Sequence, residues 1–157
     1  MENYKRKGVS CLYVAGVHER DNYPFLNKVT DQIEFRKDYT SPYAITARDT
    51  ANKMHGGEEG FKRVMSEAKR NKIKVLVDCL ARISSSRNHR KYRELLLNYL
   101  DEEGRRKICY GTDGQSLNYE DTAMLNYRKK ESWDLLIEEV ETFAQRHGVD
   151  GIHLDNG

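Results

Sequence analysis

The chain has 157 residues, of which 38% are hydrophobic and 33% charged, a composition typical of a globular domain rather than a disordered protein. Its 27 basic and 25 acidic residues leave a formal charge of only +2, so nucleic acid is not expected as a partner. No apolar run approaches the roughly 20 residues of a membrane-spanning helix, and residues 1–17 lack a clear signal-peptide cleavage site, so we expect no membrane contact.

The cysteines and histidines indicate neither disulfides nor a metal site. Cys11, Cys79 and Cys109 are odd in number, widely spaced and surrounded by apolar residues, which predicts reduced, buried thiols. Such thiols are typical of a cytoplasmic protein, and the absence of an Asn-x-Ser/Thr sequon agrees with that location. We expect no metal and no cofactor, because metal-ligand spacing is missing among His18, His55, His89 and His147.

The first half of the chain alternates between strand and helix patterns. Residues 8–17, "GVSCLYVAGV", form a short apolar run rich in valine, which predicts a strand buried on both faces. Residues 18–56 are polar and contain both prolines, so we expect a long loop. Residues 57–72 predict an amphipathic helix with acidic residues in its first turn and basic residues in its last. Its apolar residues follow helical spacing: Phe61, Val64, Met65 and Ala68.

The second half continues the alternation. Residues 73–81, "IKVLVDCLA", predict a second buried strand, and residues 92–99 have the spacing of another helix. A polar loop is expected at 110–122, then a third amphipathic helix over 133–147 and a last strand, "GIHLD", at 151–155. The residues of the last two helices that we expect in the core are Tyr92, Leu95, Leu96, Tyr99, Trp133, Leu136, Ile137, Val140 and Ala144.

The order of these elements predicts an α/β protein built from parallel strands with crossover helices. In such sheets the ligand site lies at the carboxyl ends of the strands. Asp78 comes late in the second predicted strand and Asp155 ends the third, so both carboxylates are expected near the functional edge. The periodicity leaves open whether the sheet is open or closed into a barrel.

Three stretches of the sequence resemble, in the right order, the α-amylase family of glycoside hydrolases and transglycosylases. They are "SPYAITARDTANKMHGGEEGF" at 41–61, "RNKIKVLVDCLARISS" at 70–85 and "LNYRKKESWDLLIEEVETFAQRHGVDGIHLDNG" at 125–157. The resemblance implies that residues 1–157 are one fragment of a (β/α)₈ TIM barrel, a partial barrel of about strands two to four, with no second domain.

The resemblance also implies roles for particular side chains. Asp155 matches the catalytic nucleophile, and His153 stands where the family has an arginine that steadies the charge of that nucleophile. Asp78 matches a structural aspartate beside the sugar-binding subsite, and Tyr43 matches the position of a possible sugar-stacking platform. Arg82 lies where the motif has an asparagine that belongs to the same subsite.

The motifs depart from the family at several positions. Ile83 replaces a histidine that binds the sugar, unless a slipped alignment places the pair Asn88 and His89 there, and Ala47 replaces an aspartate. Because the arginine partner is lost, Asp155 is either the nucleophile or an inherited carboxylate that ends a strand. Similarly, His153 is either a substitute charge partner or a core histidine, and the charge of a histidine depends on pH.

Two functions follow as expectations. The first is an α-amylase-like glycoside hydrolase or glucanotransferase that acts on α-glucans, such as maltooligosaccharides, through a retaining mechanism. The second is a catalytically inactive family member, a pseudoenzyme that serves as a structural or carbohydrate-binding component of a larger assembly. A third idea, a barrel enzyme for phosphorylated substrates, lacks a glycine-rich phosphate loop.

The number of predicted strands sets a further expectation. Three strands cannot close a barrel of eight, and the family's acid/base glutamate belongs to strand five. We therefore expect the chain to belong to a longer protein or to be completed by partner proteins that cover its open edge. By itself, it is expected not to cleave glycosides.

Overall fold

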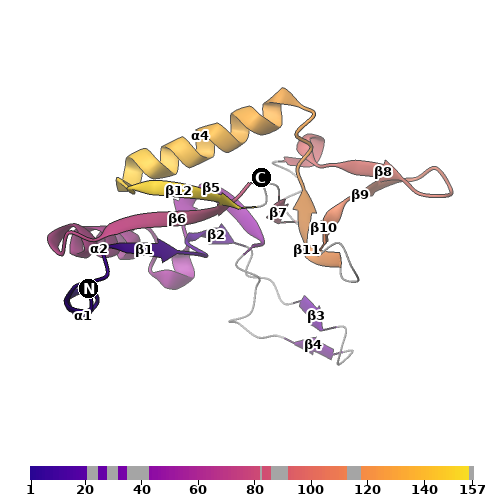
Figure 1. The fold of residues 1–157 in the computed structure, drawn as a ribbon. Coiled ribbons are helices and arrows are strands. Elements are labelled where there is room, and N and C mark those ends of the chain that lie inside the picture. Colours follow the sequence, from indigo (N-terminus) through magenta and orange to yellow (C-terminus); the bar gives the residue numbers. More distant parts are fainter. Residues whose placement is uncertain are drawn as a thin grey trace. The chain divides into compact units, whose positions relative to one another are not determined.

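The computed structural model describes residues 1–20, 25–27, 32–34, 43–81, 83–85, 92–112 and 118–155. The chain forms two compact units (Figure 1). The first unit consists of Met1–Glu19, Ala47–Ala81 and Asp134–Gly157, and the second of Arg20–Thr46 and Arg82–Trp133. Within the described ranges, no helix is long and apolar enough to cross a lipid bilayer.

The first unit contains a three-stranded parallel sheet. Its strands are β1 (Cys11–Val14), β6 (Lys74–Leu80) and β12 (Gly151–Asp155), in the order β1-β6-β12 (Figure 1). The helix α2 (Gly57–Arg70) lies between β1 and β6 in the sequence, and α4 (Lys130–His147) lies between β6 and β12. Parallel neighbours joined through helices confirm the predicted α/β arrangement. A short helix, α1 (Glu2–Arg6), precedes β1.

The sequence of α2 explains where this helix begins. The residue before it, Gly56, has φ of +95°, a left-handed conformation that favours glycine. Glu58 and Glu59 lie in the first turn, where negative charge stabilises the positive end of the helix dipole. Gly60 is needed for a close approach, because a Cβ atom there would lie 2.9 Å from the carbonyl oxygen of His55.

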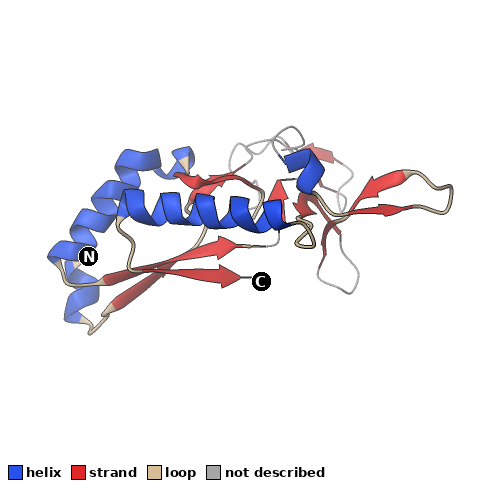
Figure 2. Cartoon of the chain, turned by 90° about the horizontal axis from the view of Figure 1, so that it is seen from above, coloured by secondary structure: helices blue, strands red, loops and turns tan. Residues whose placement is uncertain are grey.

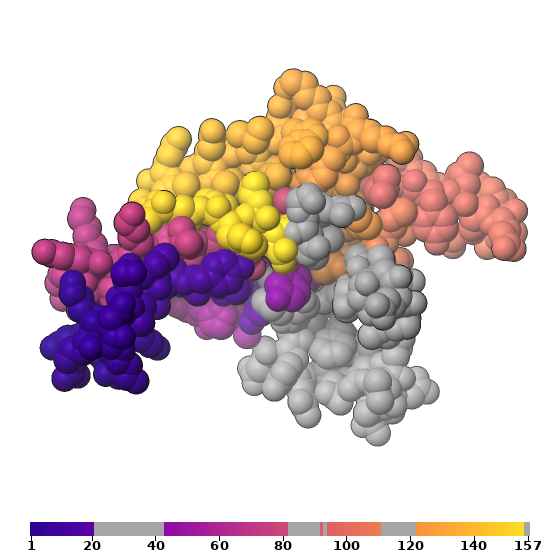
Figure 3. All heavy atoms as spheres, viewed as in Figure 1, coloured from indigo at the N-terminus to yellow at the C-terminus, as the bar shows by residue number. Residues whose placement is uncertain are grey.

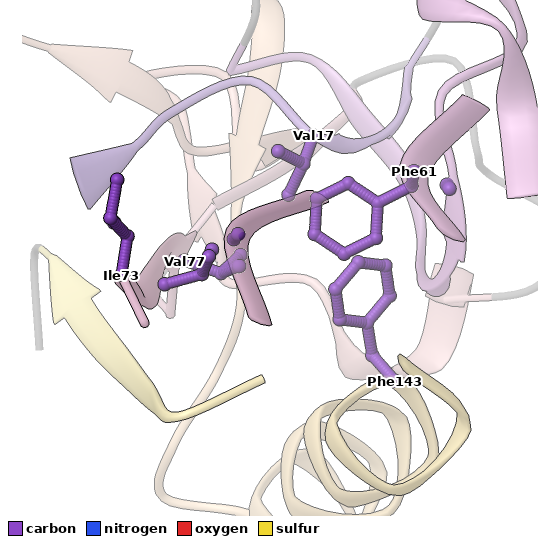
Figure 4. Packing of buried hydrophobic residues seen from close by; sticks show 8 residues of the cluster. Val17, Phe61, Ile73, Val77 and Phe143 are labelled. Atoms are coloured by element: carbon purple, nitrogen blue, oxygen red, sulfur yellow. The ribbon is translucent and has the colours of Figure 1, made fainter. Parts of the chain in front are cut away.

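A hydrophobic core fills the space between the sheet and the two long helices. The rings of Phe61 on α2 and Phe143 on α4 lie 5.4 Å apart and meet in the centre of this core (Figure 4). Figure 2 shows both helices on one side of the sheet strands. Side chains alternate along a strand, so Val75 and Val77 of β6 face this core and are fully buried. The buried members are Val17, Ala51, Phe61, Ala68, Ile73, Val75, Val77 and Phe143.

Part of the predicted loop at 18–56 is regular structure. The strand β2 (His18–Arg20) pairs with β5 (Ile45–Ala51), and a 3-10 turn, η1 (Lys53–His55), precedes α2. Asn52 caps this turn, since its side-chain oxygen accepts a hydrogen bond from the backbone N–H of Met54.

The second unit consists mainly of antiparallel strands. In its three-stranded sheet, β11 (Asn118–Met124) lies between β10 (Tyr110–Thr112) and β7 (Ile83–Ser85). Two further strand pairs are β3 (Phe25–Asn27) with β4 (Gln32–Glu34) and β8 (Asn98–Leu100) with β9 (Arg106–Ile108). Trp133 packs against Tyr127, with ring centroids 4.4 Å apart, and its Nε1 donates to the Tyr127 carbonyl oxygen.

The predicted helix over residues 92–99 is wrong. The chain makes only a 3-10 turn, η2 (Arg93–Leu95), and then enters the β8–β9 pair. The backbone groups of this segment bond to strand neighbours instead, because Leu96 bridges to Leu125 and Leu97 N–H donates to the Met124 carbonyl. Gly104, with φ of +73°, lies in the turn between β8 and β9.

Several burial predictions are also corrected. In β1, residues alternate between exposed and half-buried, so this strand is not buried on both faces and Cys11 is exposed. Cys79 is buried as predicted, and Cys109 is half-buried. Trp133 and Tyr99 are 48% and 52% exposed, so they are not core residues. Ile137 is likewise 50% exposed, whereas Leu136 is buried.

The core predicts a strong effect of Phe143→Ala. Phe143 is fully buried, so the substitution is expected to reduce the free energy of unfolding by about 3–5 kcal/mol, measured by chemical denaturation with circular dichroism. Ile137→Ala on the exposed face of the same helix is the control, with an expected change below about 1 kcal/mol. Equal effects of the two substitutions would contradict the described core.

Candidate functional site

The strand register brings four polar side chains to the face of the sheet that lies opposite the core. On β12, His153 pairs with Asp78 of β6, and Asp155 pairs with Leu80. On β1, Tyr13 pairs with Leu76. Because paired residues of neighbouring strands point to the same side, Tyr13, Asp78, His153 and Asp155 share a face that Val75 and Val77 do not.

Three of these side chains are in contact and form the Tyr13–His153–Asp78 cluster. The Nδ1 atom of His153 lies 3.1 Å from Oδ1 of Asp78 and 3.3 Å from the hydroxyl oxygen of Tyr13. The rings of Tyr13 and His153 meet edge to face, with centroids 5.5 Å apart and an interplanar angle of 75°. The Asp78 side chain is only 7% exposed, whereas that of His153 is 54% exposed. The cluster therefore combines a buried carboxyl group, that of Asp78, with an accessible imidazole, that of His153.

Asp155 lies on the same face, at the carboxyl end of β12. Asp155 is exposed. Its backbone carbonyl accepts a hydrogen bond of 3.0 Å from the N–H of Ala81, the residue after β6. In the space-filling view the C-terminal segment, coloured yellow, lies at the surface (Figure 3). The backbone pairing continues past the end of β6, so the position that carries the Asp155 carboxylate is held by the sheet.

A buried ion pair supports the end of β6 from within the first unit. Arg48 of β5 is fully buried, and its Nε donates to the carbonyl oxygen of Leu80 at 3.1 Å. Its guanidinium lies 3.4 Å from the carboxylate of Glu139 on α4, which is 3% exposed. A buried charge requires a partner of opposite charge, and Arg48 and Glu139 are partners for each other. Leu80 is the register partner of Asp155, so Arg48 holds the backbone beside that carboxylate.

Burial perturbs two ionisable groups near this ion pair. Burial raises the pKa of the Cys79 thiol to about 11, so this cysteine is a neutral thiol. Burial, with the nearby positive charge of Arg48, lowers the pKa of His18 to about 4. Neither ring nitrogen of His18 has a hydrogen-bond partner among the described residues, and its ring packs edge-on against Phe143. His18 is therefore a neutral core histidine at pH 7.

A second buried histidine, His147, is the last residue of α4. The Nε2 atom of His147 is 2.9 Å from a carboxylate oxygen of Glu58, and its ring contacts Phe61 and Phe143. Burial lowers the pKa of His147, although the charge of Glu58 opposes this shift. Among the described residues, no three His, Cys, Asp or Glu side chains are grouped as metal ligands.

The predicted site residues are found in different parts of the chain. Asp78 and His153 are in contact, and Asp155 shares their face. Tyr43 belongs to the second unit, where it is 45% exposed. Arg82 and the pair Asn88 and His89 lie outside the described residues.

Sequence reasoning missed Tyr13, Arg48 and Glu139. The alternation of "CLYV" contains the signal for Tyr13, because Leu12 and Val14 pack against the core and Tyr13 must point the other way. Arg48 stands in a segment without clear periodicity, and its partner is 91 residues away in the sequence. No local pattern identifies that pair.

Comparisons with known proteins identify the fold. No protein-family model matches the sequence, and no curated protein sequence matches it. Solved structures do match, with the α-amylase from Lactobacillus plantarum giving a TM-score of 0.72 at 22% identity over 98% of this chain. The chain has an α-amylase-type fold.

Two further structures agree. The maltogenic α-amylase AmyB from Thermotoga neapolitana matches 96% of this chain at 21% identity, with a TM-score of 0.67. The trehalulose synthase MutB from Pseudomonas mesoacidophila MX-45 matches 98% of it at 17% identity, with a TM-score of 0.69. The chain spans about a third of the length of these structures. It covers 32% of the L. plantarum enzyme, 32% of the T. neapolitana enzyme and 29% of the P. mesoacidophila enzyme. The predicted partial α/β barrel and the predicted resemblance are thereby confirmed.

The buried His18 predicts a loss of stability in acid. In the folded chain His18 binds its proton only near pH 4, whereas an ordinary histidine binds it near pH 6.5. Acid therefore favours the unfolded state between these values, and up to about 3 kcal/mol of stability, present above about pH 6.5, is lost as the pH falls to about 4. His18→Phe is expected to remove this part of the pH dependence in denaturation curves.

The control is the same replacement at an exposed histidine, His55→Phe, which should keep the loss of stability in acid that arises from His18. If His18→Phe has the same slope of stability against pH as the unsubstituted protein, the acid sensitivity arises elsewhere, with His147 as the other buried candidate.

Proposed function

We propose that this chain is part of a glycoside hydrolase or glucanotransferase barrel that binds α-glucans across the sheet face of Tyr13, Asp78, His153 and Asp155. The observation that carries the proposal is the grouping of these side chains on one face of adjacent parallel strands. The α-amylase-type fold supports it, because ligands of such barrels bind at the carboxyl ends of the strands.

Asp155 is the proposed nucleophile of a retaining mechanism. Its carboxylate attacks the anomeric carbon, and the leaving glycosidic oxygen takes a proton from a carboxylic acid elsewhere in the barrel, which gives a covalent glycosyl–enzyme intermediate. Water or a hydroxyl group of a second glucan then attacks the same carbon and gives its proton to the carboxylate left by that acid, so the bond to Asp155 breaks and the sugar is released. A nucleophile must be held in position, and two contacts support this role: the bond from Ala81 N–H to the Asp155 carbonyl and the Arg48 bond to Leu80.

The remaining barrel strands are proposed to come from a longer chain or from partner proteins. Within the described part of the chain, β1 and β12 each pair with β6 on one side only. A barrel has no such edges, because every strand pairs on both sides. The sheet face with the candidate site would then point into the barrel, and the face with Val75 and Val77 already packs on helices.

A second candidate function is an inactive, carbohydrate-binding member of the same fold. The observation in its favour is the contact between His153 and Asp78. A histidine that is committed to Asp78 is a weaker support for an ionised Asp155 than the permanently charged arginine of the family. In this case the sheet face binds glucan and no bond is cleaved.

The test compares Asp155→Asn with the unsubstituted protein, both purified as the complete native protein with its partners. Incubation with maltohexaose, followed by chromatography of the products, is expected to show turnover that falls at least about 10³-fold in the variant. Glu141→Gln, at an exposed carboxylate on α4, is the control and should keep full activity.

Calorimetry on the same samples separates the two candidates. Binding of maltohexaose without turnover in either protein would support the inactive carbohydrate-binding function and overturn catalysis by Asp155. Absence of both binding and turnover would overturn both proposals.

A further inference from the structure

The nitrogen atom Nδ1 of His153 has two oxygen neighbours, and they determine where the imidazole proton lies. A carboxylate only accepts hydrogen bonds, so Nδ1 must carry hydrogen to bond with Oδ1 of Asp78 at 3.1 Å. The Tyr13 hydroxyl, 3.3 Å from Nδ1, is a weaker second neighbour that can accept from the same N–H. The contacts thus favour the tautomer with hydrogen on Nδ1.

The other ring nitrogen, Nε2, is then a hydrogen-bond acceptor. The contacts of the imidazole with Asp78 and with Tyr13 both use Nδ1, and Nε2 has no hydrogen-bond partner among the described residues. The His153 side chain is 54% exposed on the same face as Asp155. Tyr13 limits rotation of the ring, because the two rings meet edge to face at 75°. The cluster therefore presents a fixed acceptor atom.

We infer that Nε2 of His153 binds a free hydroxyl group of the sugar, with Asp78 and Tyr13 as positioning residues. The class of ligand rests on the proposed function. An arginine at this position is a donor only, and it can bond to hydroxyl groups, ring oxygens and glycosidic oxygens alike. An acceptor bonds only to a group with a hydrogen to donate. The position accordingly selects a hydroxyl group over an ether oxygen, and it supplies no positive charge to Asp155 while the ring is neutral.

The first experiment measures the tautomer directly. Two-bond 1H–15N correlation spectra of the complete native protein with its partners at pH 8.5, where an ordinary imidazole is neutral, distinguish a ring nitrogen with hydrogen from one without it. We expect hydrogen on Nδ1 of His153 in the unsubstituted protein and in Tyr13→Phe. In Asp78→Ala the acceptor is lost, and the population should shift toward hydrogen on Nε2. His55, which is exposed, serves as the internal reference.

The tautomer test remains decisive if Asp78→Ala fails to fold, because the unsubstituted protein alone gives the answer. Hydrogen on Nε2 in that protein overturns the inference, whether or not a sugar binds. Tyr13→Phe removes only the hydroxyl group from a side chain that is 54% exposed, so it is expected to fold.

The second experiment adds maltotriose to the same samples. We expect the Nε2 resonance to move on binding, and we expect Asp78→Ala to bind maltotriose about 5-fold more weakly, as for the loss of one hydrogen bond. If maltotriose shifts the amide signals of Tyr13 and Asp155 but not Nε2, the inference fails while the proposed function stands. If no signal shifts at all, both fail.

Discussion

The alternation of side chains along β6 is the constraint on which the rest of the first unit depends. Val75 and Val77 point into the core against Phe61 and Phe143, and Leu76 and Asp78, which alternate with them along the strand, must point the other way. Asp78 is thereby fixed on the opposite face, and the parallel register adds His153 beside it. A slip of one residue would bury carboxylate and imidazole among aromatic rings, so the core that stabilises the fold also keeps the polar cluster on its proper face.

The end of the sheet has a different kind of support. Beyond the core, the backbone of Leu80 is held by a buried guanidinium whose charge is balanced by Glu139 on α4. Replacing one partner would leave the other charged and buried, which typically costs several kcal/mol. This arrangement joins β5, β6 and α4 at the level where Asp155 emerges, and it does so with polar groups that a purely apolar core does not provide. The rigidity of the strand ends therefore depends on residues that are distant in the sequence.

The parts that the sequence predicted share one property, a strong local pattern of apolar residues. The helix from Gly57 is read correctly because its apolar residues follow helical spacing, and the strand around Val77 because it is a short apolar run, which the structure buries continuously from Val77 to Leu80. The segment after Tyr92 fails because its apolar spacing also suits a turn followed by strand pairing, and the bridge from Leu96 to Leu125 decides between them. Asp78 and Asp155 were found through their place at strand ends, whereas Arg48 was not, since its partners come from two other elements.

Trp133 is the only tryptophan of the chain, and its location has a practical consequence. It is half exposed against Tyr127 in the second unit, whereas the Phe61 and Phe143 rings belong to the first. Its fluorescence therefore reports on the surroundings of the first turn of α4, while far-ultraviolet circular dichroism is dominated by α2 and the rest of α4. Coincident unfolding curves from the two signals would mean that both units melt in one cooperative transition, and separate curves would give each unit its own stability.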